Sequence, residues 1–123
     1  MAEDIQQQTQ HKTFNLVGQT TLKELLALID RAKALIAPDT GPAHMASAVG
    51  TPVIGLYATS NPLRTGPYLS QKWVINRYPQ AMQKYSGKTV AQARWGERVR
   101  HPEAMQIITV NDVKQMLCEL INK

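Results

Sequence analysis

One stretch decides the fold of this chain: ALIAPDTGPAHMASAVGTPVIGLY, residues 34–57. Its two ends, Ala34–Ala37 and Val53–Tyr57, are short apolar runs of the kind that forms strands buried on both faces of a sheet. Between them, Pro42 suits the first turn of a helix and Gly50 suits its end. The stretch therefore predicts a strand, a short helix and a second strand parallel to the first.

An earlier strand and helix are expected upstream of this unit. Phe14–Val17 is an apolar run closed by a glycine, and we predict a strand there. Thr21 and Glu24 have the spacing of a capping box, and the leucine-rich residues that follow have the periodicity of a helix that ends near Ala32. Three strands joined by two helices predict an α/β fold with a parallel sheet and flanking helices.

The remaining elements have weaker signals. We predict a short polar helix over Met1–Gln10, a fourth strand over Lys72–Asn76, and helices over Pro79–Tyr85, Lys88–Val99 and Asn111–Ile121. Asn111 is the expected N-cap of the last helix. The single cysteine, Cys118, excludes an internal disulfide and is expected to be buried on the apolar stripe of that helix.

The turn after the first of the two central strands is the candidate ligand site. Asp39, Thr40 and Gly41 lie between the end of that strand and the N-terminus of the following helix, which is where open α/β sheets bind ligands. Free N–H groups and the helix dipole attract an anion, and Thr40 and His44 offer side-chain donors. The alternative is that Asp39 and Thr40 only cap the helix and that His44 is a surface residue.

The loop after the second central strand also reaches this edge of the predicted sheet. Thr59, Ser60 and Asn61 are candidates to contact a bound sugar or phosphate, and an ordinary solvated loop is the alternative.

The net charge of +5 is unevenly distributed. Residues 1–60 carry four Lys and Arg against five acids, whereas residues 61–123 carry ten against four. The basic half fits either a solvated face or attraction to anionic lipid headgroups or a phosphorylated acceptor. Tyr78, Tyr85 and Trp95 lie among these charges, either as buried aromatics or as exposed stacking groups.

No apolar run approaches the ~20 residues of a membrane span, and the N-terminus lacks the pattern of a signal peptide. A cytoplasmic protein is therefore expected.

Four short motifs follow one another in a fixed order: Asp39-Thr-Gly-Pro-Ala-His44, Ala48-Val-Gly50-Thr-Pro52, Asn61-Pro62 and Gly66-Pro67-Tyr68. Together they resemble the donor-binding signature of the ADP-heptose:lipopolysaccharide heptosyltransferases, glycosyltransferase family 9. The similarity is good over residues 15–68 and loose elsewhere. It implies that residues 1–123 are the C-terminal part of the nucleotide-sugar-binding domain of a two-domain GT-B enzyme with Rossmann-like sheets, and residues 1–13 are expected to be poorly ordered.

The resemblance also implies roles for individual residues. Thr40, Gly41 and His44 would bind the diphosphate of ADP-heptose while Asp39 orients the turn, with no metal and no cofactor besides the donor substrate. Further nucleotide or sugar contacts are implied for Gln19, Thr20, Thr21, Thr59 and Asn61. The catalytic base and the lipopolysaccharide core acceptor would lie on a missing N-terminal domain, so the chain alone is expected to be inactive.

Two further expectations concern partners. An exposed strand edge, at Phe14–Val17 or whichever strand is outermost, favours self-association. Attraction of the basic half to anionic lipid headgroups would give peripheral contact with the inner membrane. Two other functions are alternatives: a non-transferase nucleotide-sugar enzyme of epimerase type and, last, a basic nucleic-acid-binding module, for which no recognised motif is present.

Overall fold

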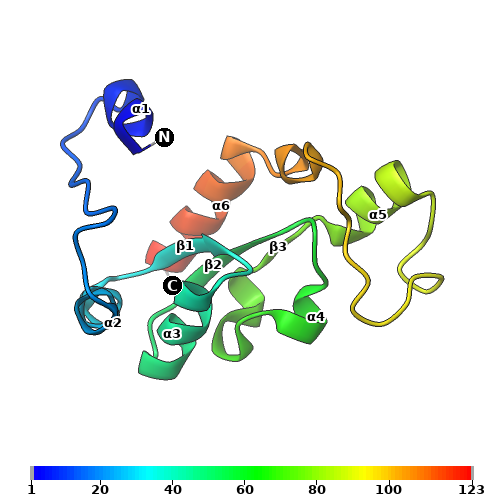
Figure 1. Cartoon of the computed structure of the whole chain (residues 1–123), viewed down its shortest axis with the longest axis horizontal. Coiled ribbons are helices and arrows are strands. Elements are labelled where there is room, and N and C mark those ends of the chain that lie inside the picture. The colour runs from blue at the N-terminus through cyan, green and yellow to red at the C-terminus, as the bar shows by residue number, and fades with distance from the viewer. Residues whose placement is uncertain (1, 123) are drawn as a thin grey trace.

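A computed structural model of the chain describes residues 2–122 and has a three-stranded parallel sheet at its centre (Figure 1). The strands β1 (Leu35–Pro38), β2 (Val53–Tyr57) and β3 (Ile75–Asn76) lie in that order across the sheet. Leu35 of β1 is opposite Val53, and Leu56 of β2 is opposite Ile75. The predicted α/β fold is therefore confirmed, and so is the strand–helix–strand unit of residues 34–57.

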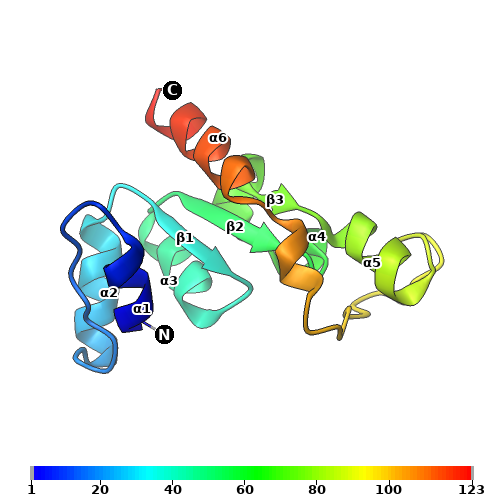
Figure 2. The same ribbon diagram turned by 90° about the horizontal axis from the view of Figure 1, so that it is seen from above.

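Residues 2–122 also form six α-helices and two 3-10 helices. They are α1 (Ala2–Gln8), α2 (Leu22–Arg31), α3 (Gly41–Val49), α4 (Pro62–Thr65), η1 (Tyr68–Trp73), α5 (Tyr78–Ser86), η2 (Ala104–Ile107) and α6 (Val110–Ile121). Figures 1 and 2 show α3 and α6 on opposite faces of the sheet, with α1 standing away from it. None of the helices in the described range is long and apolar enough to cross a membrane.

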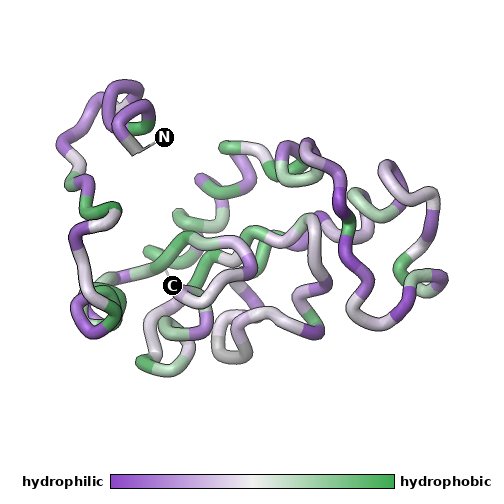
Figure 3. Tube along the Cα trace, in the orientation of Figure 1, coloured by the Kyte–Doolittle hydropathy of each residue, from purple (hydrophilic) through white to green (hydrophobic). Residues whose placement is uncertain are grey.

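Within residues 2–122, two apolar clusters lie on the two faces of the sheet, because successive strand residues point in opposite directions, and a third cluster gathers around Tyr78, Met82 and Val99. On one face, Ala37 and Val53 pack with Ile29 of α2 and with the alanines of α3. On the other face, Ile54 and Ile75 pack with Leu120 of α6. Figure 3 shows the same distribution as a hydrophobic centre among mainly hydrophilic loops.

Helix α3 lies close to the sheet because its buried side is made of small residues. Ala43 and Ala46 are fully buried, and a larger side chain at either position would push the helix away. Gly50 ends the helix with φ +80°, a left-handed conformation that favours glycine. The hydroxyl of Thr51 then donates to the carbonyl oxygen of Ile29 at 2.7 Å, which ties α2 to the end of α3.

Two strand predictions need correction. Phe14–Val17 is not a strand: it is irregular chain in which Phe14 and Val17 are about three-quarters exposed. An apolar run forms a strand only where a neighbouring strand pairs with it, and within residues 2–122 the outermost strand on this side is β1. The strand predicted over Lys72–Asn76 is shorter than expected, because η1 occupies the chain as far as Trp73.

The helix predictions have mixed outcomes. The polar N-terminal helix is confirmed as α1, Met1 itself lying outside the described residues, and the helices expected near residues 22–32 and 79–85 are confirmed as α2 and α5. The helix predicted over Lys88–Val99 is wrong, since this segment forms only turns. It has too few apolar residues at helical spacing to pack one face, and Gly96 adopts φ +83°.

The last helix contains two further corrections. The N-cap of α6 is Thr109, not Asn111, because Thr109 and Asp112 form a complete capping box. Cys118 is exposed rather than buried. The apolar face of α6 that contacts the sheet is centred on Leu120 and includes Val113, Met116 and Leu117, and Cys118 lies beside that face.

Candidate functional site

Strand β1 brings Asp39, Thr40 and Gly41 to the carboxyl edge of the sheet, where α3 begins. Thr40 is the N-cap residue in extended conformation, but its side chain makes no capping hydrogen bond. Its hydroxyl instead donates to the carbonyl oxygen of Pro38 at 3.4 Å. Thr40 therefore caps α3 by position only, without a side-chain hydrogen bond to the N–H groups at the start of the helix, and His44 is exposed on its first turn.

The carboxylate of Asp39 connects three elements. Its Oδ2 accepts a hydrogen bond from the hydroxyl of Thr65 in α4 at 3.1 Å, and its Oδ1 lies 3.8 Å from Nε2 of His44 in α3. The Asp39 side chain is only 15% exposed, whereas that of His44 is 55% exposed. Asp39 thus fixes the turn and holds an imidazole whose other side remains open to a ligand.

Tyr57, at the end of β2, also contacts Thr65. Its hydroxyl donates to the backbone oxygen of Thr65 at 3.4 Å. Burial, together with the negative charge of Asp39, raises the pKa of Tyr57 to about 12, so the phenol stays neutral and remains a donor at physiological pH. Sequence reasoning missed Thr65 and Tyr57, because no local pattern indicates that residue 65 meets residue 39.

The loop after β2 is more ordered than a solvated loop. Asn61 is 8% exposed, and its Oδ1 accepts the N–H of Leu63 at 3.0 Å, which makes Asn61 the N-cap of α4. Ser60 is buried, and its hydroxyl has no hydrogen-bond partner among residues 2–122. Thr59 is half-buried and lines an open cavity of about 510 Å³ with residues 98–102.

The predicted nucleotide residues lie elsewhere. Gln19 and Thr20 line a cavity of about 420 Å³ beside α2, and none of the turn residues 39–44 lines that cavity. Thr21 is used as the N-cap of α2, where it forms a capping box with Glu24. The structure therefore brings Asp39 and His44 together with Thr65, but it does not place residues 19–21 in the same pocket.

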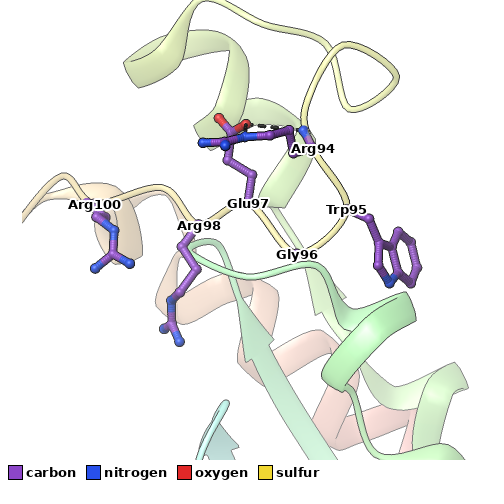
Figure 4. Close-up of a pocket in the computed structure, with 6 residues that line it drawn as sticks. All are labelled: Arg94, Trp95, Gly96, Glu97, Arg98 and Arg100. Atoms are coloured by element: carbon purple, nitrogen blue, oxygen red, sulfur yellow. Dashed lines mark hydrogen bonds and ion pairs between the residues drawn. The ribbon is translucent and has the colours of Figure 1, made fainter.

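A stretch of the basic half also reaches the edge of the sheet. A cavity of about 500 Å³ is lined by Arg94, Trp95, Gly96, Glu97, Arg98 and Arg100 (Figure 4). The aromatic residues of this region have different environments: Tyr78 is buried, Tyr85 stacks on His101 with ring centroids 4.0 Å apart, and Trp95 is 73% exposed. The charge count indicated this region only as a basic run, and its position at the edge was not predicted.

No group of three or more His, Cys, Asp and Glu residues that could hold a metal ion occurs within residues 2–122. The start of α3, which has no side-chain cap, and the exposed imidazole of His44 offer hydrogen-bond donors of the kind that suit an anion.

Comparison with known proteins shows the family of the chain. The chain is 43% identical over 99 residues to the lipopolysaccharide core heptosyltransferase OpsX of Haemophilus influenzae. This alignment covers 80% of this chain and 28% of that protein. It is also 43% identical over 63 residues to lipooligosaccharide heptosyltransferase 2 of H. influenzae, and over 53 residues to lipopolysaccharide heptosyltransferase 3 of Escherichia coli. These alignments cover 51% and 43% of this chain and 18% and 16% of the two proteins.

The chain thus spans less than a third of the length of these relatives. No solved structure matches it significantly. The profile of glycosyltransferase family 9 (heptosyltransferase), however, matches residues 1–93 and so includes the whole β1–α3–β2 unit and the Asp39 turn. The chain therefore belongs to glycosyltransferase family 9, the heptosyltransferase family.

Proposed function

We propose that this chain is the donor-binding part of a heptosyltransferase that transfers heptose from ADP-heptose to the lipopolysaccharide core. The observation that supports this most directly is the turn before α3, where Thr40 leaves the helix N-terminus without a side-chain cap and Asp39 holds His44 beside it. A diphosphate placed there receives backbone N–H groups, the helix dipole and the exposed imidazole.

The proposed chemistry is stabilisation of a leaving group. When the bond between heptose and ADP breaks, negative charge builds up on the departing diphosphate. The imidazole of His44, which is 55% exposed and lies 3.8 Å from the carboxylate of Asp39, would donate a hydrogen bond to the departing diphosphate. Gly41, at the start of α3, has open space where a side chain would begin, so a ligand can approach its backbone closely.

The names of the relatives support the substrates in this proposal, because each is a lipopolysaccharide or lipooligosaccharide heptosyltransferase. The catalytic base is assigned to an N-terminal domain of a two-domain GT-B enzyme, so this chain alone should transfer no heptose. Action in the cytoplasm, at the inner face of the membrane, is part of the same proposal.

Titration calorimetry with ADP tests the donor site. Replacing both Thr40 and His44 by alanine should weaken ADP binding by about 1–3 kcal/mol, as expected when hydrogen bonds to a charged group are lost. The matched control is His11→Ala with Thr13→Ala, two exposed residues near α1, and this variant should bind ADP like the unaltered chain. Equal affinity of the Thr40/His44 variant and the control would refute the assignment.

Self-association is proposed for the isolated chain. Within residues 2–122, β1 pairs only with β2, and Ile36 on β1 is 47% exposed, so one strand edge and adjacent apolar surface are open. Sedimentation equilibrium at micromolar concentration should show dimers or larger species. A monomer of 13.7 kDa across that range would contradict this proposal.

A further inference from the structure

The basic segment, residues 94–100, forms a cavity that the proposed donor site does not use. It supplies Arg94, Arg98 and Arg100, and the cavity it lines has a volume of about 500 Å³. Figure 4 shows Arg98 and Arg100 extending in the same direction, while Arg94 folds back over Glu97. Trp95 projects beyond Gly96 into open space in the same view. The segment therefore presents two parallel cations and a free indole.

Three contacts hold this segment in place, although it has no regular secondary structure. The N–H of Val99 donates to the backbone oxygen of Thr59 at 2.9 Å, which fixes the segment to the carboxyl end of β2. The hydroxyl of buried Tyr78 donates to the backbone oxygen of Glu97. The backbone of Gly96 lies against the guanidinium of Arg64, so closely that a Cβ atom there would be 2.9 Å from the Arg64 Cζ. A merely solvated charged run would not have these contacts.

Glu97, the acidic residue of the basic segment, forms its shortest ion pair with a lysine outside the segment and not with the arginines of the segment. Glu97 accepts the backbone N–H of Arg94 at 3.1 Å and is paired with Nζ of Lys88 at 3.1 Å, and these contacts hold the pKa of its carboxyl below the ordinary value. Arg94 reaches Glu97 only at 3.9 Å. Arg98 and Arg100 make no ion pair with any residue from 2 to 122. Their two guanidinium groups are therefore free to bind an anion.

The chemistry of these side chains suits one class of ligand. A guanidinium forms paired hydrogen bonds with a phosphate group, and two on one side of a fixed segment favour a ligand with localised negative charge. The indole of Trp95 is 73% exposed and offers a flat apolar surface with a donor at its edge, on which a sugar ring can lie. Phosphate and a sugar ring occur together in a phosphorylated saccharide.

We propose that the basic segment binds a phosphate-bearing saccharide, with Arg98 and Arg100 on the phosphate and Trp95 against the sugar ring. This surface adjoins Thr59 and Arg64 at the edge of the sheet that also carries the donor turn, so the saccharide is assigned to the acceptor side of the reaction. That assignment rests on the proposed function. The concave shape and the position at the ligand edge favour a saccharide over a flat membrane surface.

The test measures binding of a defined oligosaccharide to the purified chain. The probe is the phosphorylated inner-core oligosaccharide obtained by removing the lipid from lipopolysaccharide, and tryptophan fluorescence and calorimetry follow the titration. Arg98→Gln with Arg100→Gln should raise the Kd at least tenfold, and Trp95→Ala should raise it several-fold. Enzymatic removal of the phosphate from the oligosaccharide should cause the same loss as the double substitution.

The matched control is Lys23→Gln with Lys114→Gln, which removes the same charge from exposed sites on α2 and α6. It should leave the Kd within twofold, and far-UV circular dichroism should be equal for all variants. An unchanged Kd in the Arg98/Arg100 variant would overturn the inference. Binding to phosphatidylglycerol vesicles but not to the oligosaccharide would also overturn it, because the surface would then contact a membrane.

The ADP titration separates this inference from the proposed donor site. If the unaltered chain binds ADP but not the oligosaccharide, only the saccharide site is refuted. Normal oligosaccharide binding in a chain that fails to bind ADP would instead support the saccharide site and refute the donor site.

Discussion

Residues 35–57 and residues 88–103 reach the same edge of the sheet by different means. The first region is two strands and a helix with regular backbone hydrogen bonds and a buried apolar side. The second is a series of turns held by contacts to Thr59, Tyr78 and Arg64, which come from other parts of the chain. The first is therefore encoded locally, whereas the second depends on the rest of the fold being formed.

Three threonines sharpen this contrast, because each begins the same local motif. Thr21 with Glu24 and Thr109 with Asp112 form capping boxes that begin α2 and α6. Thr89 and Gln92 exchange the equivalent hydrogen bonds, at 3.0 and 3.3 Å, yet no helix follows. Both true helices have an apolar stripe that packs against the core. A cap positions a helix start but does not create a helix.

The largest effect is expected in the core of the first region. Ile54→Ala on β2 should lower the free energy of unfolding by about 2–5 kcal/mol, because Ile54 is fully buried. Ile36 is its register partner on β1 and is 47% exposed, so Ile36→Ala should cost only about 1 kcal/mol. Urea denaturation measures both. Equal losses would mean that β1 is covered on its outer side.

A smaller effect should separate the two kinds of cap. Thr109→Ala removes the N-cap of α6 and should cost about 1 kcal/mol of unfolding free energy. Thr89→Ala removes the same hydrogen bond where no helix depends on it, and should cost less than about 0.5 kcal/mol. Thermal unfolding of the two variants gives the comparison. A cost at Thr89 as large as at Thr109 would show that the turns of residues 88–103 stabilise the whole fold.

The smallest effect concerns pH. The backbone N–H of Thr109, assisted by Arg77, holds the pKa of Asp112 below its ordinary value. A carboxyl with a lowered folded-state pKa contributes stability above its unfolded pKa and loses it as the pH falls through the folded value. The unaltered chain should therefore lose stability below about pH 5 more steeply than Asp112→Asn. Urea denaturation at a series of pH values gives the stability of both proteins. If the two stabilities fall equally steeply below about pH 5, Asp112 does not stabilise the fold through its lowered pKa.

The candidate site was predictable only in part. The sequence indicates Asp39, Thr40, Gly41 and His44 because a strand, a turn and a helix start follow one another within a few residues. It does not indicate Thr65, whose hydroxyl meets Asp39 across 26 positions of the chain. The sequence shows Trp95 and the arginines near it only as part of a basic, aromatic-containing stretch. It does not show that they lie at the edge of the sheet, since nothing local fixes where an irregular segment lies.

The sequence by itself determined the β1–α3–β2 unit, the start of α2 and the place of the turn before α3, because apolar periodicity, small residues and caps act over a few neighbouring positions. Only the tertiary structure decided that residues 14–17 are not a strand, that residues 88–99 are not a helix, and that the basic segment reaches the edge of the sheet. Strand pairing and the docking of irregular chain depend on partners far away in the sequence, and their geometry exists only once the sheet has formed.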